Sequence, residues 1–184
     1  VISNNVEDVI PPQPPTLAAT PEPTNEATIT VEGFTEQGAE LELMINDTLN
    51  KTDKAKEDGS FIFIASLTKG QNRVQVRAKD SAGNASLSEV KLVLVDQEPV
   101  ILTINSPKDG TEFIGKNSQT LEITGKTNKM NAQVIANNSF VDVNRDGTFT
   151  HRLQLNSGEN TIKIVASDKA GNLDEQTIKV TYTP

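Results

Sequence analysis

The 184-residue sequence contains no cysteine and no tryptophan, and it has only one histidine and one tyrosine. Without cysteine there is no disulfide, no thiolate metal ligand and no cysteine nucleophile, although both the cytosol and a bacterial envelope are compatible with this lack. A single imidazole without thiolates is too few ligands for a zinc site. Because no run of 18 apolar residues exists, no part of this stretch is predicted to span a membrane.

Aromatic residues and positive charge are also scarce. Aromatics make up 4% of the chain and the net charge is −8. We expect a hydrophobic core built mainly from Val, Ile, Leu and Ala. An acidic, well-mixed surface argues against nucleic-acid binding, because phosphates require clustered Lys and Arg. We therefore expect a monomer that binds no nucleic acid and makes no membrane contact within this segment.

What the sequence does contain is an internal repeat. The phrase D-x-A-G-N begins at Asp80 and again at Asp168, an offset of 88 residues. Two further phrases recur at the same offset: L-x-x-G-x-N from Leu67 and Leu155, and D-G-[ST]-F from Asp58 and Asp146. This offset is the length of a small β-sandwich domain, so the sequence predicts two copies of one all-β module.

Short alternating apolar runs separated by turn residues predict the strands, and no segment of a dozen residues has a sustained helical period. The parity of these runs agrees between the copies, which matters because a one-residue slip turns every side chain to the other face. The last strand of each copy is predicted to turn these residues inward: Val90, Leu92 and Leu94 in the first copy, and Ile178, Val180 and Tyr182 in the second.

The offset between the copies changes along the chain. It falls from 92 at Gly33 and Gly125 to 88 at Asp58 and Asp146, which places a four-residue insertion in the first copy. The polar, lysine-rich segment 48–56 is predicted to carry the insertion as an exposed loop or a ragged edge strand.

Proline content and the repeat together set the predicted domain boundaries. Residues 1–15 are predicted to be a Pro-rich linker that is extended and semi-rigid. The first domain is predicted to span 16–96 and the second 99–184, with a short linker at 97–98.

The repeated phrases, together with residues between them, resemble bacterial immunoglobulin-like domains, including the group similar to domain B of glucodextranase. The resemblance implies an all-β chain of two tandem immunoglobulin-like β-sandwiches of Greek-key type, with little or no helix. The positions that carry it are Gly33, Asn46, Asp58 to Phe61, Leu67, Gly70, Asn72 and Ala78 to Asn84 in the first copy, and Gly125, Asn137, Asp146 to Phe149, Leu155, Gly158, Asn160 and Ala166 to Asn172 in the second.

Members of this family serve as spacers, adhesion stalks and accessory domains of surface enzymes. The resemblance therefore implies a non-enzymatic spacer or adhesion-stalk segment of a bacterial cell-surface or envelope protein, extracellular and anchored by a region outside these 184 residues. The alternatives are a module that binds a carbohydrate or protein partner, and accessory domains of an envelope enzyme. Fold analogy does not choose among them.

The D-x-A-G-N phrase is predicted to form a turn that sets strand register. Asp can accept hydrogen bonds from N–H groups of the turn, and Gly and Asn tolerate positive φ. The predicted turn residues are Asp80, Gly83 and Asn84 in the first copy and Asp168, Gly171 and Asn172 in the second.

Calcium is the alternative function for these acidic turns. Hard oxygen ligands are present at Asp58, Asp80, Asn84, Asp96, Glu98 and Asp109. The segment between the copies, however, offers only two carboxylates where the ion prefers six to eight oxygens. We expect no cofactor, with calcium as the competing hypothesis.

Catalysis is not predicted. His151 takes the position of Phe63 in the repeat, which indicates a half-buried structural histidine and not a catalytic or metal-binding one. Paired carboxylates are not expected either, because acids such as Glu32, Glu40 and Glu122 lie in outward strand positions, as does Glu42. A Lys–Asn cross-link would need a buried lysine among aromatics, and no inward-facing lysine is predicted.

Overall fold

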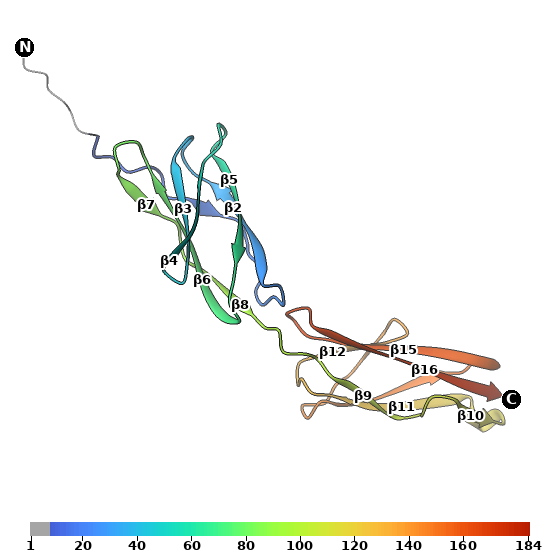
Figure 1. Cartoon of the computed structure of the whole chain (residues 1–184). Helices are drawn as coiled ribbons and strands as arrows, with labels where there is room; N and C mark the ends of the chain where they lie inside the picture. Colours follow the sequence, from blue (N-terminus) through green and yellow to red (C-terminus); the bar gives the residue numbers. More distant parts are fainter. Residues whose placement is uncertain (1–7) are drawn as a thin grey trace, which may run out of the picture. The chain divides into compact units, whose positions relative to one another are not determined.

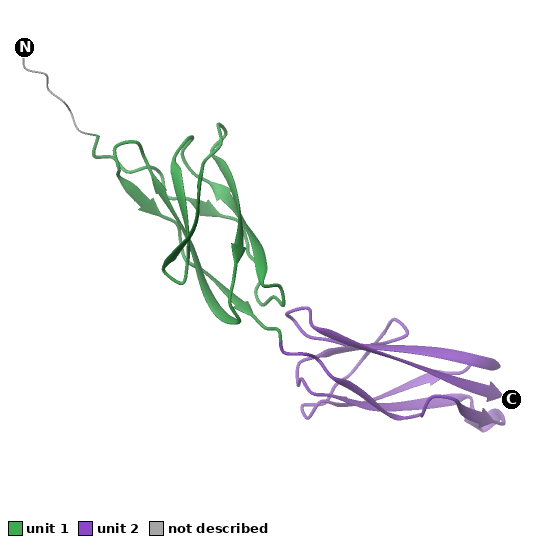
Figure 2. Cartoon of the chain, viewed as in Figure 1, with its two compact units in different colours: residues 1–97 green, residues 98–184 purple. Residues whose placement is uncertain are grey.

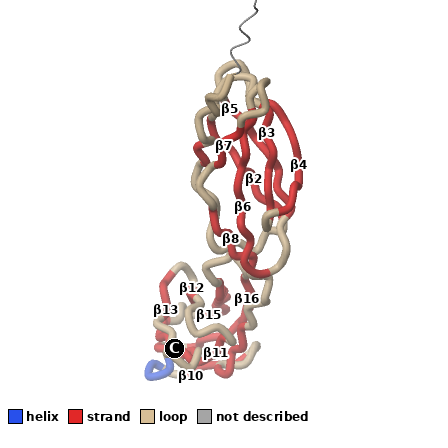
Figure 3. The backbone as a smooth tube through the Cα atoms, turned by 90° about the vertical axis from the view of Figure 1, so that its left-hand side faces the viewer, coloured by secondary structure: helices blue, strands red, loops and turns tan. Residues whose placement is uncertain are grey.

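The computed structural model describes residues 8–184, so residues 1–7 of the predicted Pro-rich linker lie outside the described part. The chain divides into two compact units, Val1–Gln97 and Glu98–Pro184 (Figures 1 and 2). Strands and loops account for nearly all of the backbone, and a short 3₁₀ helix covers Lys116–Ser118 (Figure 3). The predicted all-β, immunoglobulin-like fold is confirmed.

Unit 1 is a sandwich of two sheets. One sheet has the order β1-β2-β5, and the other has the order β4-β3-β6-β7, with β8 also paired to β6. The strands are β1 Thr16–Leu17, β2 Thr28–Phe34, β3 Glu40–Ile45, β4 Thr48–Lys54, β5 Ser60–Ser66, β6 Gly70–Lys79, β7 Ala85–Leu87 and β8 Lys91–Val95.

Unit 2 repeats this arrangement. Its sheets have the orders β14-β11-β9 and β10-β16-β15-β12-β13. The strands are β9 Leu102–Ser106, β10 Thr111–Ile114, β11 Thr120–Thr127, β12 Gln133–Ala136, β13 Ser139–Val141, β14 Thr148–Gln154, β15 Gly158–Ser167 and β16 Leu173–Thr183.

The first strand of each unit is divided between the two sheets. In unit 2, β9 pairs antiparallel with β11, and after the cis peptide bond before Pro107 the chain continues as β10, which pairs in parallel with β16. In unit 1, β1 pairs with β2, and after the cis bond before Pro23 the chain forms a parallel bridge from Thr24 to Val95. In each unit, the first part of the chain therefore pairs with a strand of one sheet and then with a strand of the other.

The core of each unit is aliphatic, as the composition predicts. Alternate residues of each strand point inward, and among the fully covered side chains are Leu43 and Val76 in unit 1 and Ile123 and Ile164 in unit 2. Burying a side chain of this size is favourable by about 1.5–3 kcal/mol.

The predicted inward parity of the last strand is wrong in unit 1. Val93 and Val95 are buried there, whereas Leu92 and Leu94 are about two-fifths exposed. In unit 2 the prediction is right, because Ile178, Val180 and Tyr182 are all buried.

The difference comes from one extra residue in unit 1. Asn72 pairs with Val93, and its counterpart Asn160 pairs with Val180, so the offset has become 87. The extra residue lies near Ser88, whose hydroxyl accepts the Val76 N–H group and interrupts the strand between β7 and β8. In unit 2 the corresponding strand, β16, is continuous.

The insertion in unit 1 lengthens the β3–β4 hairpin. β3 and β4 have six and seven residues, whereas their counterparts β12 and β13 have four and three. Every residue of β4 is exposed, so the prediction of a ragged edge strand is right, although part of the insertion lies in β3. Both hairpins close through two residues at positive φ, Asn46–Asp47 and Asn137–Asn138, the geometry that two-residue hairpins favour.

Candidate functional site

The D-x-A-G-N turn of unit 1 is closed by the side chain of Asp80. Its Oδ1 accepts the N–H groups of Ala82 and Asn84, each at 2.9 Å, and its Oδ2 accepts Asn84 Nδ2 at 2.8 Å. Gly83 lies at φ 92°, as predicted. The hydrogen bond from Asn84 Nδ2, helped by the N–H groups of the turn and opposed by burial, lowers the pKa of Asp80.

The turn of unit 2 repeats the two bonds from the asparagine and has a lysine in addition. Asp168 Oδ1 accepts the Asn172 N–H group at 3.0 Å, and Oδ2 accepts Asn172 Nδ2 at 2.9 Å and Lys129 Nζ at 2.5 Å. The side chains of Lys129 and Asp168 are only 20% and 10% exposed. The prediction of no inward-facing lysine is therefore wrong for Lys129. The repeat did not predict this lysine, because at the offset of 92 that relates Gly33 to Gly125 the first copy has Gln37.

Burial and hydrogen bonding act in opposite directions on Asp168. Burial raises its pKa, but the hydrogen bonds from Lys129 and Asn172 outweigh that effect, so the pKa lies below the usual range. The Lys129–Asp168 pair is thus a charged, partly buried ion pair inside unit 2. The pair links the turn to Lys129, in the loop before β12.

The D-G-[ST]-F phrases form a second pair of equivalent turns. Asp58 Oδ1 accepts the Ser60 N–H group at 2.9 Å, and Asp146 Oδ1 accepts the Thr148 N–H group at 3.0 Å. Hydrogen bonds from these residues lower the pKa of both aspartates. Both acids serve as turn caps in this way.

The L-x-x-G-x-N phrases use their asparagine to hold a loop. Asn72 is fully buried, and its Nδ2 donates to the carbonyl oxygens of Thr68 and Gly70 at 2.7 and 3.0 Å. Asn160 does the same with Asn156 and Gly158 at the same distances. These bonds fix the loop that precedes β6 or β15, with the asparagine buried in unit 1 and half-buried in unit 2.

The residues considered for calcium are spread over several turns of the described chain and form no cluster of three acids. Asp58 caps one turn, Asp80 and Asn84 form another, and Asp109 Oδ1 accepts the Lys179 N–H group at 2.7 Å. Asp96 follows the last strand of unit 1, and its N–H group donates to the Thr24 carbonyl. Within residues 8–184, no three acidic or histidine side chains form a group that could hold a metal.

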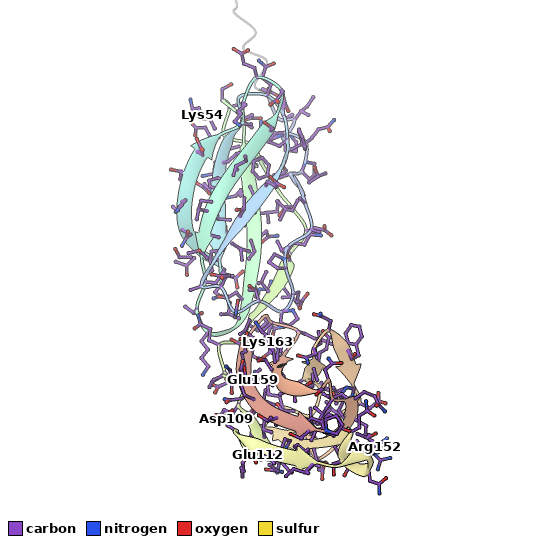
Figure 4. All side chains as sticks on the ribbon, turned by 90° about the vertical axis from the view of Figure 1, so that its right-hand side faces the viewer. Lys54, Asp109, Glu112, Arg152, Glu159 and Lys163 are labelled. Atoms are coloured by element: carbon purple, nitrogen blue, oxygen red, sulfur yellow. The ribbon has the colours of Figure 1, made fainter. Side chains whose placement is uncertain are left out.

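The residues considered for catalysis are also separated. His151 lies in β14 opposite Ile123 and is half-buried. Of the four glutamates, Glu42 alone is mostly covered. Its pKa is lowered by the hydrogen bond from Lys79, which together with Arg77 outweighs the opposite effect of burial. Figure 4 labels six exposed charged residues on the two units: Lys54, Asp109, Glu112, Arg152, Glu159 and Lys163.

Two hollows of the surface are lined in part by apolar side chains. One of about 350 Å³ lies beside β1 in unit 1 and includes Leu17, Phe34 and Ile62. Another, of about 300 Å³, lies on unit 2 along Ile135 and Val165. Neither hollow is lined by an aspartate of the repeated turns, although Ser60 and Phe61 of the D-G-[ST]-F phrase line the first one.

The Pro-rich segment is attached to unit 1, which the sequence did not predict. Asn84 Nδ2 donates to the carbonyl oxygens of Asp8 and Ile10, and Thr35 Oγ1 donates to that of Gln13. Pro12 and Pro15 are buried. Residues 8–15 therefore pack on the first domain instead of forming a separate spacer; proline content alone conceals this because it reports only an extended backbone.

No helix within residues 8–184 has the length and apolar character needed to cross a lipid bilayer.

These two units define the class of the protein: a tandem pair of immunoglobulin-like β-sandwiches whose repeated polar residues close turns and loops. The chain belongs to the glucodextranase domain B family, whose model matches residues 15–97 and 100–183.

One curated protein and one solved structure are similar to this chain. Bacillopeptidase F of Bacillus subtilis (strain 168) is 33% identical over 149 residues, which is 81% of this chain and 10% of that protein. The chain thus spans about a tenth of the length of this curated relative. The fibronectin(III)-like modules of Clostridium thermocellum CbhA share the fold with a TM-score of 0.63 at 16% identity, over 92% of this chain and 94% of that structure.

Proposed function

We propose that this chain is a non-enzymatic structural segment, a spacer or adhesion stalk, of a bacterial cell-surface or envelope protein. The observation that supports the proposal most is the use of the repeated residues. In both units the shared Asp, Asn and Gly positions bond or pack inside their own unit, as turn caps, loop anchors and close-packing glycines. Shared positions that serve the scaffold of each unit are what a spacer requires, so they support the proposal.

Localisation belongs to the same proposal. The family and the similarity to Bacillopeptidase F are consistent with an extracellular or envelope location and with an anchor outside this chain. The lack of cysteine is compatible with that location and does not establish it.

A second candidate is an accessory role beside an enzyme. The observation that favours it is the 33% identity to a stretch of Bacillopeptidase F, a protein about ten times the length of the matched region. In that case the two units would hold a catalytic region at a fixed position without contributing catalytic groups.

The experiment that tests the spacer proposal replaces residues 8–184 in the parent protein with an unrelated pair of β-sandwich domains of similar length. A spacer tolerates the replacement, so surface display or enzymatic activity should be retained, while deletion without replacement should reduce it. The isolated chain is also applied to a glycan array and to a pull-down with surface extracts. Saturable binding that Phe140→Ala abolishes would contradict the spacer proposal, because Phe140 is a 73% exposed aromatic.

A further inference from the structure

The D-x-A-G-N turn of unit 1 also binds the segment of chain that precedes the first strand of that unit. The Nδ2 group of Asn84 has two hydrogens. It contacts Asp80 Oδ2 at 2.8 Å, and it donates to the carbonyl oxygens of Asp8 at 2.9 Å and Ile10 at 3.4 Å. The segment is held again at Gln13, whose carbonyl accepts Thr35 Oγ1 at 2.9 Å.

The chemistry of the segment explains why it needs such a donor. Residues 8–11 read D-x-x-P, and Pro11 and Pro12 have no N–H group with which to join a ladder. The segment's carbonyl groups still require partners when the chain packs on a domain. A side-chain amide fixed by an aspartate supplies a donor at a defined position without a partner strand.

Unit 2 has the same elements in its own leading segment. Residues 96–99 also read D-x-x-P, and Glu98 precedes Asn172 by the same 74 residues that separate Ile10 from Asn84. Val100 is 4% exposed, as its counterpart Pro12 is buried.

A second anchor also holds the segment in unit 2. Asn128 Nδ2 donates to the Pro99 carbonyl at 3.0 Å, and Asn128 Oδ1 accepts the Ile101 N–H group at 2.8 Å. The segment is therefore fixed to unit 2 at Pro99, the last residue of the D-x-x-P phrase, and at Ile101, the counterpart of Gln13.

We propose that Asn172 is the binding residue for the segment that leads into unit 2, with Nδ2 donating to the main-chain carbonyl of Glu98. The D-x-A-G-N turn is then a recognition site for an extended, proline-terminated segment of the same chain. Asp168 orients the amide and the amide holds the segment. This inference does not depend on whether the chain is a spacer or an accessory region.

Hydrogen exchange of the whole chain tests the proposal. Asn172→Ala should speed amide exchange in a peptide covering 97–101 by about three- to tenfold, the effect of losing one hydrogen bond of ordinary net strength. Exchange at 9–13 should not change. Asn84→Ala should give the reverse pattern, and Lys169→Ala and Ser81→Ala, in the same turns, should alter neither segment.

Two further measurements separate binding of the segment from damage to the turn. Asp168→Asn removes the carboxylate but leaves the Asn172 amide in place, so it should affect 97–101 less than Asn172→Ala does. In the unaltered chain, NMR should show a coupling across the hydrogen bond from Asn172 Nδ2 to the carbonyl carbon of Glu98. Equal effects of the two variants, no effect of Asn172→Ala while Asn84→Ala loosens 9–13, or the lack of that coupling, would overturn the inference.

Discussion

Phe149 lies across the β11–β14 ladder from Gly125, and its ring occupies the space that a side chain at Gly125 would take. A Cβ atom added there would lie 2.8 Å from Phe149 Cε1 and 2.7 Å from the Thr103 carbonyl oxygen. Phe61 and Gly33 have the same relationship in unit 1. The phenylalanine of the D-G-[ST]-F phrase therefore packs against the strand glycine, and this pair occurs in both copies.

This packing predicts that Gly125→Ala destabilises unit 2. The ring of Phe149 could turn aside, but the Thr103 carbonyl belongs to the paired strand β9 and has little freedom, so overpacking should cost about 1–3 kcal/mol. Urea unfolding monitored by NMR signals of each unit measures the effect. Lys126→Ala, at the next, exposed position, serves as the control, and a Gly125→Ala chain as stable as that control would contradict the packing argument.

Gly171 predicts a second, local loss of stability. Its φ of 93° is unfavourable for residues with a Cβ atom, and most of all for a β-branched one. Gly171→Val should lower the free energy of unfolding of unit 2 by about 1–3 kcal/mol and leave unit 1 nearly unchanged. Lys169→Val, in the same turn, is the matched control. Equal losses in both units would show that they do not unfold independently.

The bonds to the leading segment predict where the first unit begins. A fragment of residues 8–97 should fold cooperatively by itself, because it contains a complete sandwich and core. A fragment of 16–96 should be less stable by about 1–3 kcal/mol, since it loses the hydrogen bonds of Asn84 and Thr35 and the burial of Pro12 and Pro15. Urea titration of both fragments tests this prediction. Equal unfolding midpoints would show that residues 8–15 do not stabilise unit 1 and form a separate linker.

The Lys129–Asp168 pair predicts a dependence of stability on pH. The pKa of Asp168 is lowered in the folded state, so its contribution is fully present above the unfolded value of about 3.9 and is lost as pH falls through the folded pKa. The free energy of unfolding of unit 2 should therefore fall in strong acid. Asp168→Asn should weaken unit 2 at neutral pH and flatten this dependence below pH 4. Glu175→Gln, which alters an exposed pair, should leave the curve unchanged in shape.

Much of the fold was predictable because the two copies check each other. The strands, the register in most of them and the edge position of the insertion follow from positions that recur with the same parity. The prediction of the inward face was wrong for the last strand of unit 1. Its residues at both parities are apolar, so alternation does not distinguish the two faces: Leu92, Val93, Leu94 and Val95. In unit 2, the polar Lys179 and Thr181 separate the buried residues, and the choice is clear.

The site was less predictable, for a physical reason. The D-x-A-G-N turns could be identified as turns, because Asp, Gly and Asn each have a local conformational role. Their partners, Lys129 in one unit and the carbonyl groups of Asp8 and Ile10 in the other, lie far away in sequence. Only folding brings such partners to the turn, and neither a single lysine nor a proline-rich segment reveals its partner.

The response to calcium distinguishes a plain spacer from a metal-dependent stalk. In the described structure, Asp58, Asp80 and Asp109 already accept main-chain N–H groups, so these acids act as hydrogen-bond acceptors of the fold itself. A ligand present at 100 times its dissociation constant would stabilise the folded state by about 2.7 kcal/mol, which moves the Tm of a domain of this size by several degrees. We predict that millimolar calcium and excess EDTA give melting curves within about one degree of each other. Magnesium at the same ionic strength controls for screening of the net charge of −8. A rise of several degrees that is specific to calcium and abolished by Asp96→Asn would instead establish a calcium site at the segment between the two units.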